Sequence, residues 1–189
     1  MSSDSSVLKT LYVEKIVPEL KKTQGYKNIH DVPKLTKVVI NSGVSATKDK
    51  QFLEDAIKDI GAITGQKPVV TKARISVSNF KLREGMPVGV KVTLRGEKMW
   101  EFLYRFINLA LPAIRDFRGV ASKLDGNGNY NIGVADHTIF PEISGDAKNI
   151  ALGMDVTLVT SAKSDDEGRE LLRLIGVPFR KNSSEEQAA

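Results

Sequence analysis

Seven lysine or arginine residues and a single acid, Glu84, lie in the stretch from Gln66 to Arg95. Lysine and arginine side chains bind phosphate, because they carry the opposite charge and donate hydrogen bonds to its oxygens. A surface that is merely solvated usually mixes both signs of charge, and this stretch does not. It also contains glycines, hydroxyl side chains and one aromatic residue, Phe80, a mixture typical of RNA-binding surfaces. The stretch therefore predicts a nucleic-acid-binding site.

The charge is unevenly distributed along the chain of 189 residues. The net charge is +5 and the pI is about 9.3, whereas residues 66–95 alone carry +6. Residues 125–189 contain six bases and eleven acids, a net charge of −5. This distribution predicts a dipolar molecule, with one surface that faces a polyanion and another that does not.

Three other polar patterns resemble catalytic or metal-binding motifs, but the first is best explained as a chance match and the other two as structural features. Ser45-Ala-Thr-Lys48 matches S-x-x-K, but the S-D-N and K-T-G motifs that accompany it in penicillin-recognising enzymes are absent. Gly126-Asn-Gly128 lacks the spacing of a phosphate-binding loop and is typical of a hairpin turn with positive φ. Asp165, Asp166 and Glu167 could chelate Mg²⁺, but they open an expected helix, where capping and the helix dipole favour acids.

The residue types needed for redox or metal chemistry are scarce. The chain has no cysteine, which excludes a disulfide scaffold, an iron–sulfur cluster and a thiolate zinc site. His30 and His137 belong to no metal-like spacing. No nucleophile stands beside a base in a recognisable motif. We therefore expect no enzyme, no metal and no cofactor.

The ends and the hydropathy of the chain indicate an intracellular protein. The start, MSSDSSVLKT, is polar and has neither the basic region nor the apolar run of a signal peptide. No apolar run approaches the roughly 18 residues of a membrane helix. We expect no association with a membrane.

Hydrophobic periodicity predicts the order α, β, α, β, β, α, β, β, α. The expected helices are 7–23, 52–65, 97–117 and 164–176, and the expected strands lie in 35–41, 68–74, 88–95, 125–134 and 154–162. Pro18 and Pro112 are expected to kink the first and third helices. The absence of a regular βαβ alternation predicts an α+β fold, with a mostly antiparallel sheet, helices on one face and the other face open.

The strand 88–95 indicates what the open face offers. Val88, Val90, Val92 and Leu94 alternate with Gly89, Lys91, Thr93 and Arg95. Because side chains alternate between the two faces of a strand, one face is core and the other is small, hydroxylated and basic. The long connection from 75 to 87 ends in the turn sequence EGMP and is expected to be functional.

Long segments of the chain, in order, resemble a known protein family. These segments are QKPVVTKARISVSNFKLREGMPVGVKVTLRGEKMWEF, LPAIRDFRG, DGNGNYNIGV, IFPEI, TSAKSDDEGRELL and VPFRK. They are similar to the bacterial large-subunit ribosomal protein number five family, the 5S ribosomal RNA-binding protein of the central protuberance. The resemblance extends from about Tyr12 to Lys181.

The resemblance implies a fold, a function and a set of partners. The fold would be a five-stranded antiparallel sheet with helices on its convex side, in a single α+β domain over 1–182. That domain would have an N-terminal half at about 28–84 and a C-terminal half at about 88–178, followed by a flexible tail, 183–189. The protein would be a ribosome-bound, cytoplasmic constituent of the large subunit. Its partners would be 5S rRNA, large-subunit rRNA, P-site tRNA, neighbouring large-subunit proteins and a small-subunit head protein.

The resemblance also assigns RNA-binding residues. The matching positions are Lys37, Asn41, Gln66 and Thr93, whose side chains suit phosphates, 2′-hydroxyls and base edges. We add as expected phosphate contacts Lys91 and Arg95, which share the face of Thr93, and Lys67, Lys72 and Arg74, which lie in the basic stretch. The loop that touches tRNA in the family corresponds to about 76–87, with Ser76, Ser78, Asn79, Phe80, Lys81 and Arg83 as its contact residues.

The sequence departs from the family pattern at four positions. Ile75 stands where a base is common, and Asn79 stands where glycine is common. Ser42 and Ser45 replace the usual residues of an N-x-G-V-G segment. Since asparagine tolerates positive φ, we expect the loop geometry to be kept.

The basic stretch and the resemblance together predict a structural ribosomal protein that binds RNA without catalysing a reaction. The alternative is a non-ribosomal regulatory RNA-binding domain, which sedimentation with or without large subunits would distinguish. A nuclease or phosphotransferase would instead show metal-dependent turnover.

Overall fold

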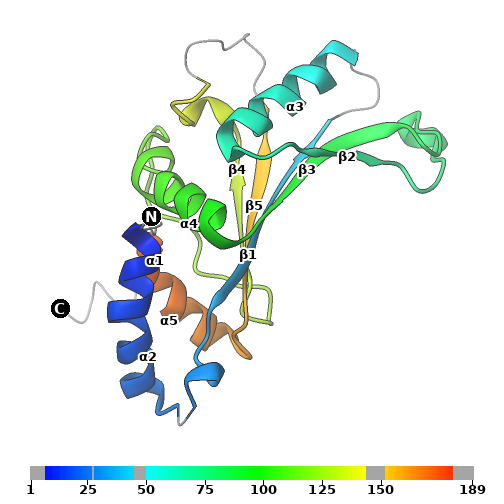
Figure 1. The fold of residues 1–189 in the computed structure, drawn as a ribbon. Coiled ribbons are helices and arrows are strands. Elements are labelled where there is room, and N and C mark those ends of the chain that lie inside the picture. Colours follow the sequence, from blue (N-terminus) through cyan, green and yellow to red (C-terminus); the bar gives the residue numbers. More distant parts are fainter. Residues whose placement is uncertain (1–6, 27, 45–49, 144–151, 181–189) are drawn as a thin grey trace, which may run out of the picture.

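The computed structural model of the protein describes residues 7–26, 28–44, 50–143 and 152–180. Figure 1 shows a twisted sheet with helices gathered on one side of it. A two-stranded arm extends from the sheet, well away from the body of the molecule (Figure 1).

Over the ranges that the structure describes, the sheet has five strands and every pair of neighbours is antiparallel. The strands are β1 (Leu35–Gly43), β2 (Val69–Lys72), β3 (Pro87–Leu94), β4 (Tyr130–Val134) and β5 (Met154–Thr160). Their order in the sheet is β2-β3-β1-β5-β4. The α+β class and the order of elements expected from periodicity are confirmed.

The first helical segment is divided near Pro18. It consists of α1 (Val7–Leu11), the π-helix η1 (Tyr12–Ile16) and α2 (Val17–Gln24), which ends at Gly25 with φ +70°. Proline has no N–H to donate, so it is tolerated in the first turn of a helix, where the N–H groups lack partners anyway. The wider π turn before Pro18 lets one helical segment continue into the next.

The helix expected over 97–117 is shorter than its pattern suggests. α4 (Gly96–Arg105) continues as the π-helix η4 (Phe106–Ala110), and the helical backbone ends before Pro112. The prediction that it continues to 117 was wrong, because Pro112 removes a donor and its ring clashes with a preceding carbonyl. Asp116 then has φ +56°, which no helix allows.

The remaining elements of the described residues are two α-helices and three short 3₁₀ turns. They are α3 (Lys50–Thr64), α5 (Asp165–Ile175), η2 (Ile29–Asp31), η3 (Ser78–Phe80) and η5 (His137–Ile139). The capping role expected for the acids of α5 is present, since Ser164 Oγ accepts from the Glu167 N–H at 3.4 Å. Glu167 in turn accepts from the Lys163 N–H at 3.0 Å.

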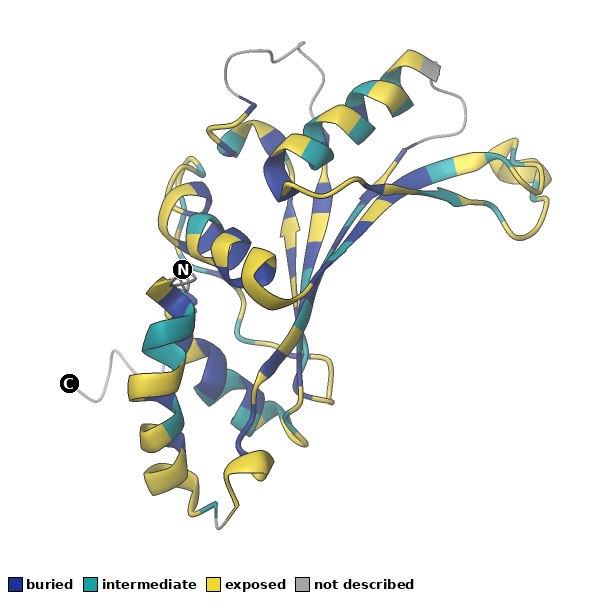
Figure 2. Cartoon of the chain, viewed as in Figure 1, coloured by how far each residue is buried: buried dark blue, intermediate teal, exposed yellow. Residues whose placement is uncertain are grey.

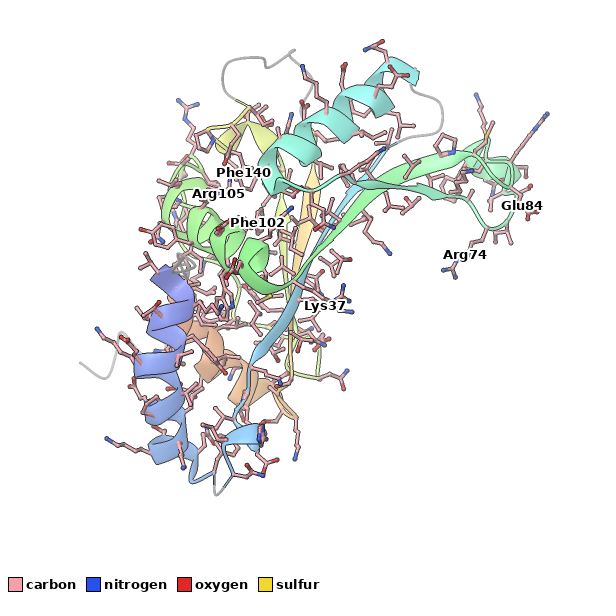
Figure 3. The ribbon with its side chains drawn as sticks, in the orientation of Figure 1. Lys37, Arg74, Glu84, Phe102, Arg105 and Phe140 are labelled. Carbon is pink, nitrogen blue, oxygen red and sulfur yellow. The ribbon has the colours of Figure 1, made fainter. Side chains whose placement is uncertain are left out.

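One face of the sheet is buried against the helices. Figure 2 shows the helix sides that face the sheet as buried and the arm as mostly exposed. Phe102 and Phe106 stack at 5.7 Å between ring centroids, and Phe140 lies 6.0 Å from Phe102 (Figure 3). The buried strand residues beneath the helices are Val38, Ile40, Val90, Val92, Leu94, Val156 and Leu158.

Arg105 connects three parts of the helical layer. Its Nη2 donates to the carbonyl of Ile63, near the end of α3, at 3.0 Å, and its Nη1 pairs with Glu142. The carbonyls in the last turn of a helix lack partners in the helix itself, so a cation there satisfies one of them. Arg105 thereby fixes α3 against α4 and against the segment after η5.

The glycine-rich turn before β4 is held by two carboxylates. Asp125 Oδ1 accepts from the Asn127 N–H at 2.9 Å, and Asp165 Oδ1 accepts from the Gly128 N–H at 2.9 Å. Gly126 and Gly128 have φ +91° and +75°, as the turn interpretation expects. The turn does not form a hairpin, however, because β4 pairs with β5 and not with a strand before it.

Gly89 lets β1, β2 and β3 approach closely. A Cβ at this position would lie 2.7 Å from the Ser42 carbonyl oxygen and 3.0 Å from Thr71 Oγ1. A Cβ built on Gly43, which lies opposite Gly89 in the β1–β3 register, would have no heavy atom of another part of the chain within 4 Å. The two glycines thus lie side by side on neighbouring strands, but an added methyl group would meet close atoms only at Gly89.

We predict that Gly89→Ala destabilises the protein by about 1–3 kcal/mol, because the added methyl group displaces backbone atoms of β1. Gly43→Ala, the matched control, should change the free energy of unfolding by less than about 0.5 kcal/mol. Urea denaturation measures both. Equal stabilities of the two variants would contradict this account of Gly89.

The Asp125 carboxylate makes stability depend on pH. Hydrogen bonds, first from the Asn129 side chain and then from the Asn127 N–H, hold the pKa of Asp125 below its usual value of 3.8. The ionised form is therefore favoured by folding, and its contribution is present above about pH 4 and is lost as pH falls through the folded-state pKa.

We predict that Asp125→Asn, which cannot ionise, is less stable than the wild type at pH 6. The difference in free energy of unfolding should shrink as pH falls below about 4, because the wild type then loses the same charge. Denaturant titrations from about pH 2.5 to about pH 6 measure it. A difference that stays constant over this range would refute the role of the ionised carboxylate.

Candidate nucleic-acid interface

The face of the sheet opposite the helices carries the polar residues of β1 and β3. Asn41 pairs with Lys91 and Val39 pairs with Thr93 in the antiparallel register. Lys91 is exposed, and Asn41 and Thr93 are half-buried. Since neighbouring strands lie about 4.8 Å apart, these side chains form one continuous surface. This surface, the side chains of the five strands on the side away from the helices, is called the open face below.

Lys37 and Arg95 lie at one end of the open face. Lys37 is on β1, opposite Val159 of β5, and projects on the side of the sheet that the helices leave uncovered (Figure 3). Arg95 follows β3 with an extended backbone, φ −141° and ψ 164°, so the alternation of β3 continues through it. Arg95 therefore shares the side of Thr93 and Lys91.

Gln66 reaches the same region from the end of α3. Its Nε2 donates to the carbonyl of Thr93 at 3.3 Å, where β2 no longer pairs with β3. Gln66 and the adjacent Lys67 are both exposed. The structure thus brings together Lys37, Asn41, Gln66, Lys91, Thr93 and Arg95, with Lys67 next to them.

The open face also includes residues of β4 and β5 that sequence reasoning missed. Asp155 pairs with Asn41 and with Gly133, and Thr157 pairs with Val39 and with Asn131. The alternation of buried and partly exposed residues in MDVTLVT was the signal that could have indicated Asp155 and Thr157. It did not show which strands would lie beside β1.

The bases of this region are not neutralised by the described parts of the protein. The side chains of Lys37, Lys67, Lys91 and Arg95 take part in no ion pair or hydrogen bond with the described residues. The same holds for Lys72 and Arg74 on the arm. Uncompensated cations on one side of a protein create a positive potential that attracts polyanions.

The arm continues the β2–β3 pair beyond the strands themselves. The Ala73 N–H donates to the Met86 carbonyl at 2.8 Å, and Val77 and Leu82 exchange two hydrogen bonds of 3.0 Å. Lys72 lies at a register shift opposite Pro87. Arg74 is exposed further along and, like Lys37, projects on the side away from the helices (Figure 3). The arm therefore separates its tip from the open face.

The tip of the arm is a compact turn with an exposed aromatic ring. Ser76 Oγ accepts from the Glu84 N–H at 3.0 Å, and the Lys81 N–H donates to the Ser78 carbonyl at 3.0 Å. Phe80 is 71% exposed, so its ring is available to a partner. The exposed residues of the tip are Ile75, Ser76, Ser78, Asn79, Phe80, Lys81, Arg83 and Glu84.

The positive φ expected at Asn79 lies elsewhere. Asn79 is in η3, and the left-handed residue is Lys81, with φ 52°. Ser42 is buried and its Oγ donates to the Gly153 carbonyl at 2.6 Å, so it does not belong to the open face. Ser45 and the rest of its S-x-x-K motif lie outside the described residues.

Two buried or half-buried tyrosines with a raised pKa donate to backbone carbonyls. Burial raises the pKa of Tyr130 to about 12, and its hydroxyl donates to the Ala121 carbonyl. Burial also raises the pKa of Tyr12, which donates to the Pro33 carbonyl at 3.0 Å. His137 is buried, with Nε2 3.2 Å from Asp59 Oδ2, whereas His30 is exposed.

The part of the chain that the structure describes has neither a metal-like cluster nor a membrane span. It contains no group of three or more His, Cys, Asp or Glu side chains placed to hold a metal ion. Among the described helices, none has both the length and the apolar character needed to span a bilayer.

Comparison with known proteins identifies the family. Residues 28–83 match the family model described as ribosomal protein L5, and residues 87–179 match the model for the C-terminus of the same ribosomal family. The large ribosomal subunit protein uL5 of Synechocystis is 56% identical over 175 residues, which cover 92% of this chain and 97% of the relative. The protein of the same name from Halothermothrix orenii is 54% identical over 92% of this chain and 98% of its own length.

The chain belongs to the ribosomal protein L5 family. As an L5 protein it is a structural constituent of the large ribosomal subunit, ribosome-bound in the cytoplasm, and it does not catalyse a reaction. It associates with large-subunit rRNA and with other ribosomal proteins, and it acts in translation. The family recognised from the sequence is confirmed, and with it the structural, rRNA-binding role of the chain; the part of the basic stretch in that binding stays a prediction.

Proposed function

We propose that this L5 protein binds 5S rRNA through its open face and helps to attach that RNA to the large subunit in the central protuberance. The observation that carries the proposal is the group of hydrogen-bonding side chains and bases, left unpaired by the described residues, that share one side of the sheet. The bases neutralise phosphates, and the polar groups fix the register of the RNA on the strands.

The proposed contacts divide by chemistry. Lys37, Lys67, Lys91 and Arg95 contact phosphates, because their side chains are cations that the described residues leave unpaired. Asn41, Gln66 and Thr93 contact 2′-hydroxyls or base edges, because they offer donors and acceptors without a charge. Lys72 and Arg74 extend the phosphate-binding track toward the arm.

The tip of the arm is proposed to touch P-site tRNA. An exposed phenylalanine can stack on a base or ribose, and Lys81 and Arg83 beside it can pair with phosphates. Ser76, Ser78 and Asn79 add hydrogen-bonding groups around Phe80. A contact with a small-subunit head protein is proposed from the family resemblance.

We predict that Lys91→Glu and Arg95→Glu each weaken the affinity for 5S rRNA by roughly ten- to a hundredfold, since a hydrogen bond to a charged group contributes about 1.5–3 kcal/mol. The slope of log K against log salt should also fall by roughly 0.7–0.9 for each phosphate that the variant no longer neutralises. Filter binding at several salt concentrations measures both quantities.

Lys22→Glu on α2 is the matched control, since it makes the same charge change on an exposed helix of the opposite side of the molecule (Figure 1). If Lys22→Glu weakens binding as much as Lys91→Glu does, the open face is not the binding surface. All three variants should unfold at the wild-type urea concentration.

We predict that Phe80→Ala with Arg83→Glu lowers the occupancy of the P site by tRNA in ribosomes reassembled with the variant. The affinity of the isolated protein for 5S rRNA should stay close to that of the wild type, because the arm separates the tip from the open face. Unchanged tRNA binding would refute the proposed contact between the tip and tRNA, without bearing on the proposed binding of 5S rRNA by the open face.

A further inference from the structure

Asp155 places a carboxylate on the open face. It lies on β5, is exposed, and pairs in the register with Asn41 on one side and Gly133 on the other. Among the described strand residues of that face it is the acid, whereas Lys37 and Lys91 are bases. A carboxylate is unexpected on a surface proposed to lie against a polyanion, so its partners need an explanation.

The protein does not neutralise this carboxylate within its described residues. Asp155 makes no ion pair or side-chain hydrogen bond with any of them. Lys91 lies two strands away in the same row, at roughly 10 Å from strand spacing alone, with Asn41 between them. At that distance Lys91 supplies no direct hydrogen bond to Asp155.

The space around the carboxylate is open toward β4. A Cβ built on Gly133 would lie 3.7 Å from Asp155 Oδ1, so the carboxylate leans over a residue that has no side chain. Asn131 and Thr157 pair with each other two residues further along the same two strands. Among the described residues, this half of the open face therefore offers hydrogen-bonding groups and no cation, in contrast to the half formed by β1 and β3.

Contact with RNA phosphates would be repulsive at this position. A carboxylate only accepts hydrogen bonds, and it can accept two parallel N–H donors at once. RNA supplies such donors as the amino and imino N–H groups of base edges and as the 2′-hydroxyl. An RNA that turns a base edge or ribose toward β5 would thus satisfy a charge that the described residues leave unpaired.

We propose that Asp155 is an RNA-reading residue that accepts hydrogen bonds from an N–H or O–H donor of the bound RNA. The open face then has two functions: β1 and β3 hold phosphates, and β5 with β4 reads a base edge or a 2′-hydroxyl. This proposal rests on the proposed binding of 5S rRNA by the same face.

The direction in which Asp155→Asn changes the affinity for RNA tests the proposal. Electrostatics alone predicts that Asp155→Asn tightens RNA binding, because a negative charge is removed. We expect instead that Asp155→Asn weakens the affinity for 5S rRNA by about fivefold to a hundredfold, the range for one good base contact. The slope of log K against log salt should stay at the wild-type value, because the number of neutralised phosphates does not change.

Glu14→Gln, which removes an exposed negative charge from η1, is the matched control and should leave the affinity unchanged or slightly raised. Equal or tighter binding by Asp155→Asn would overturn the proposal. Lys91→Gln, measured in parallel, separates the binding of 5S rRNA by the open face from the reading role of Asp155. If Lys91→Gln weakens binding while Asp155→Asn does not, the open face is supported as the binding surface and the reading role of Asp155 is refuted. If neither variant weakens binding, the proposed function itself fails.

Nucleotide analogue interference then distinguishes the two donors. Pools of 5S rRNA carrying sparse inosine, which lacks the guanine amino group, or sparse 2′-deoxynucleotides are selected for binding to the wild type and to Asp155→Asn. A position that interferes with the wild type and not with the variant identifies the donor. Weakened binding with an identical interference pattern for both proteins would exclude a guanine amino group and a 2′-hydroxyl as the donor, since the variant would then still use every one of these partners that the wild type uses.

Discussion

The burial of one face of the antiparallel sheet is the constraint on which the rest of this structure depends. Val38 and Ile40 of β1 and Val92 of β3 lie beneath the helices, each contributing about 1.5–3 kcal/mol when removed from water. Because side chains alternate, burying these residues turns Asn41 and Lys91 to the opposite side. A slip by one residue would bury the lysine instead, at a cost of several kcal/mol for an unpaired ion. The open face and the core are thus fixed together.

The helices add rigidity to the surface that they do not form. The three stacked phenylalanines and the Arg105 contacts hold α3 and α4 on the sheet. RNA recognition by side chains on strands needs such support, since each side chain must stand at a fixed distance from its neighbours. Gln66 illustrates the link, because the end of α3 positions it and its amide completes the edge of β3 at Thr93.

The open face and the arm differ in position and in chemistry. β1 and β3 carry cations that the described residues leave unpaired, and β5 and β4 carry uncharged groups and one carboxylate. The arm carries bases that lead to an exposed phenylalanine. A uniformly basic surface would bind any RNA. In the proposed complex, hydrogen-bonding groups held in register between the cations, such as Asn41 and Thr93, would permit discrimination between RNAs.

The sequence by itself determined the class of fold, the alternation of β3, the basic character of residues 66–95 and the family, because each of these is a local or collinear property of the chain. It did not determine that Asp155 and Thr157 would join Asn41, because strand order depends on contacts between residues far apart in the chain. Nor did it place the positive φ at Lys81, or the end of the third helix before Pro112, where local geometry competes with periodicity. Tertiary structure decided the strand order, because packing and hydrogen bonds between distant segments select it, whereas Pro112 ended the helix locally, because it lacks a donor and its ring clashes with a preceding carbonyl.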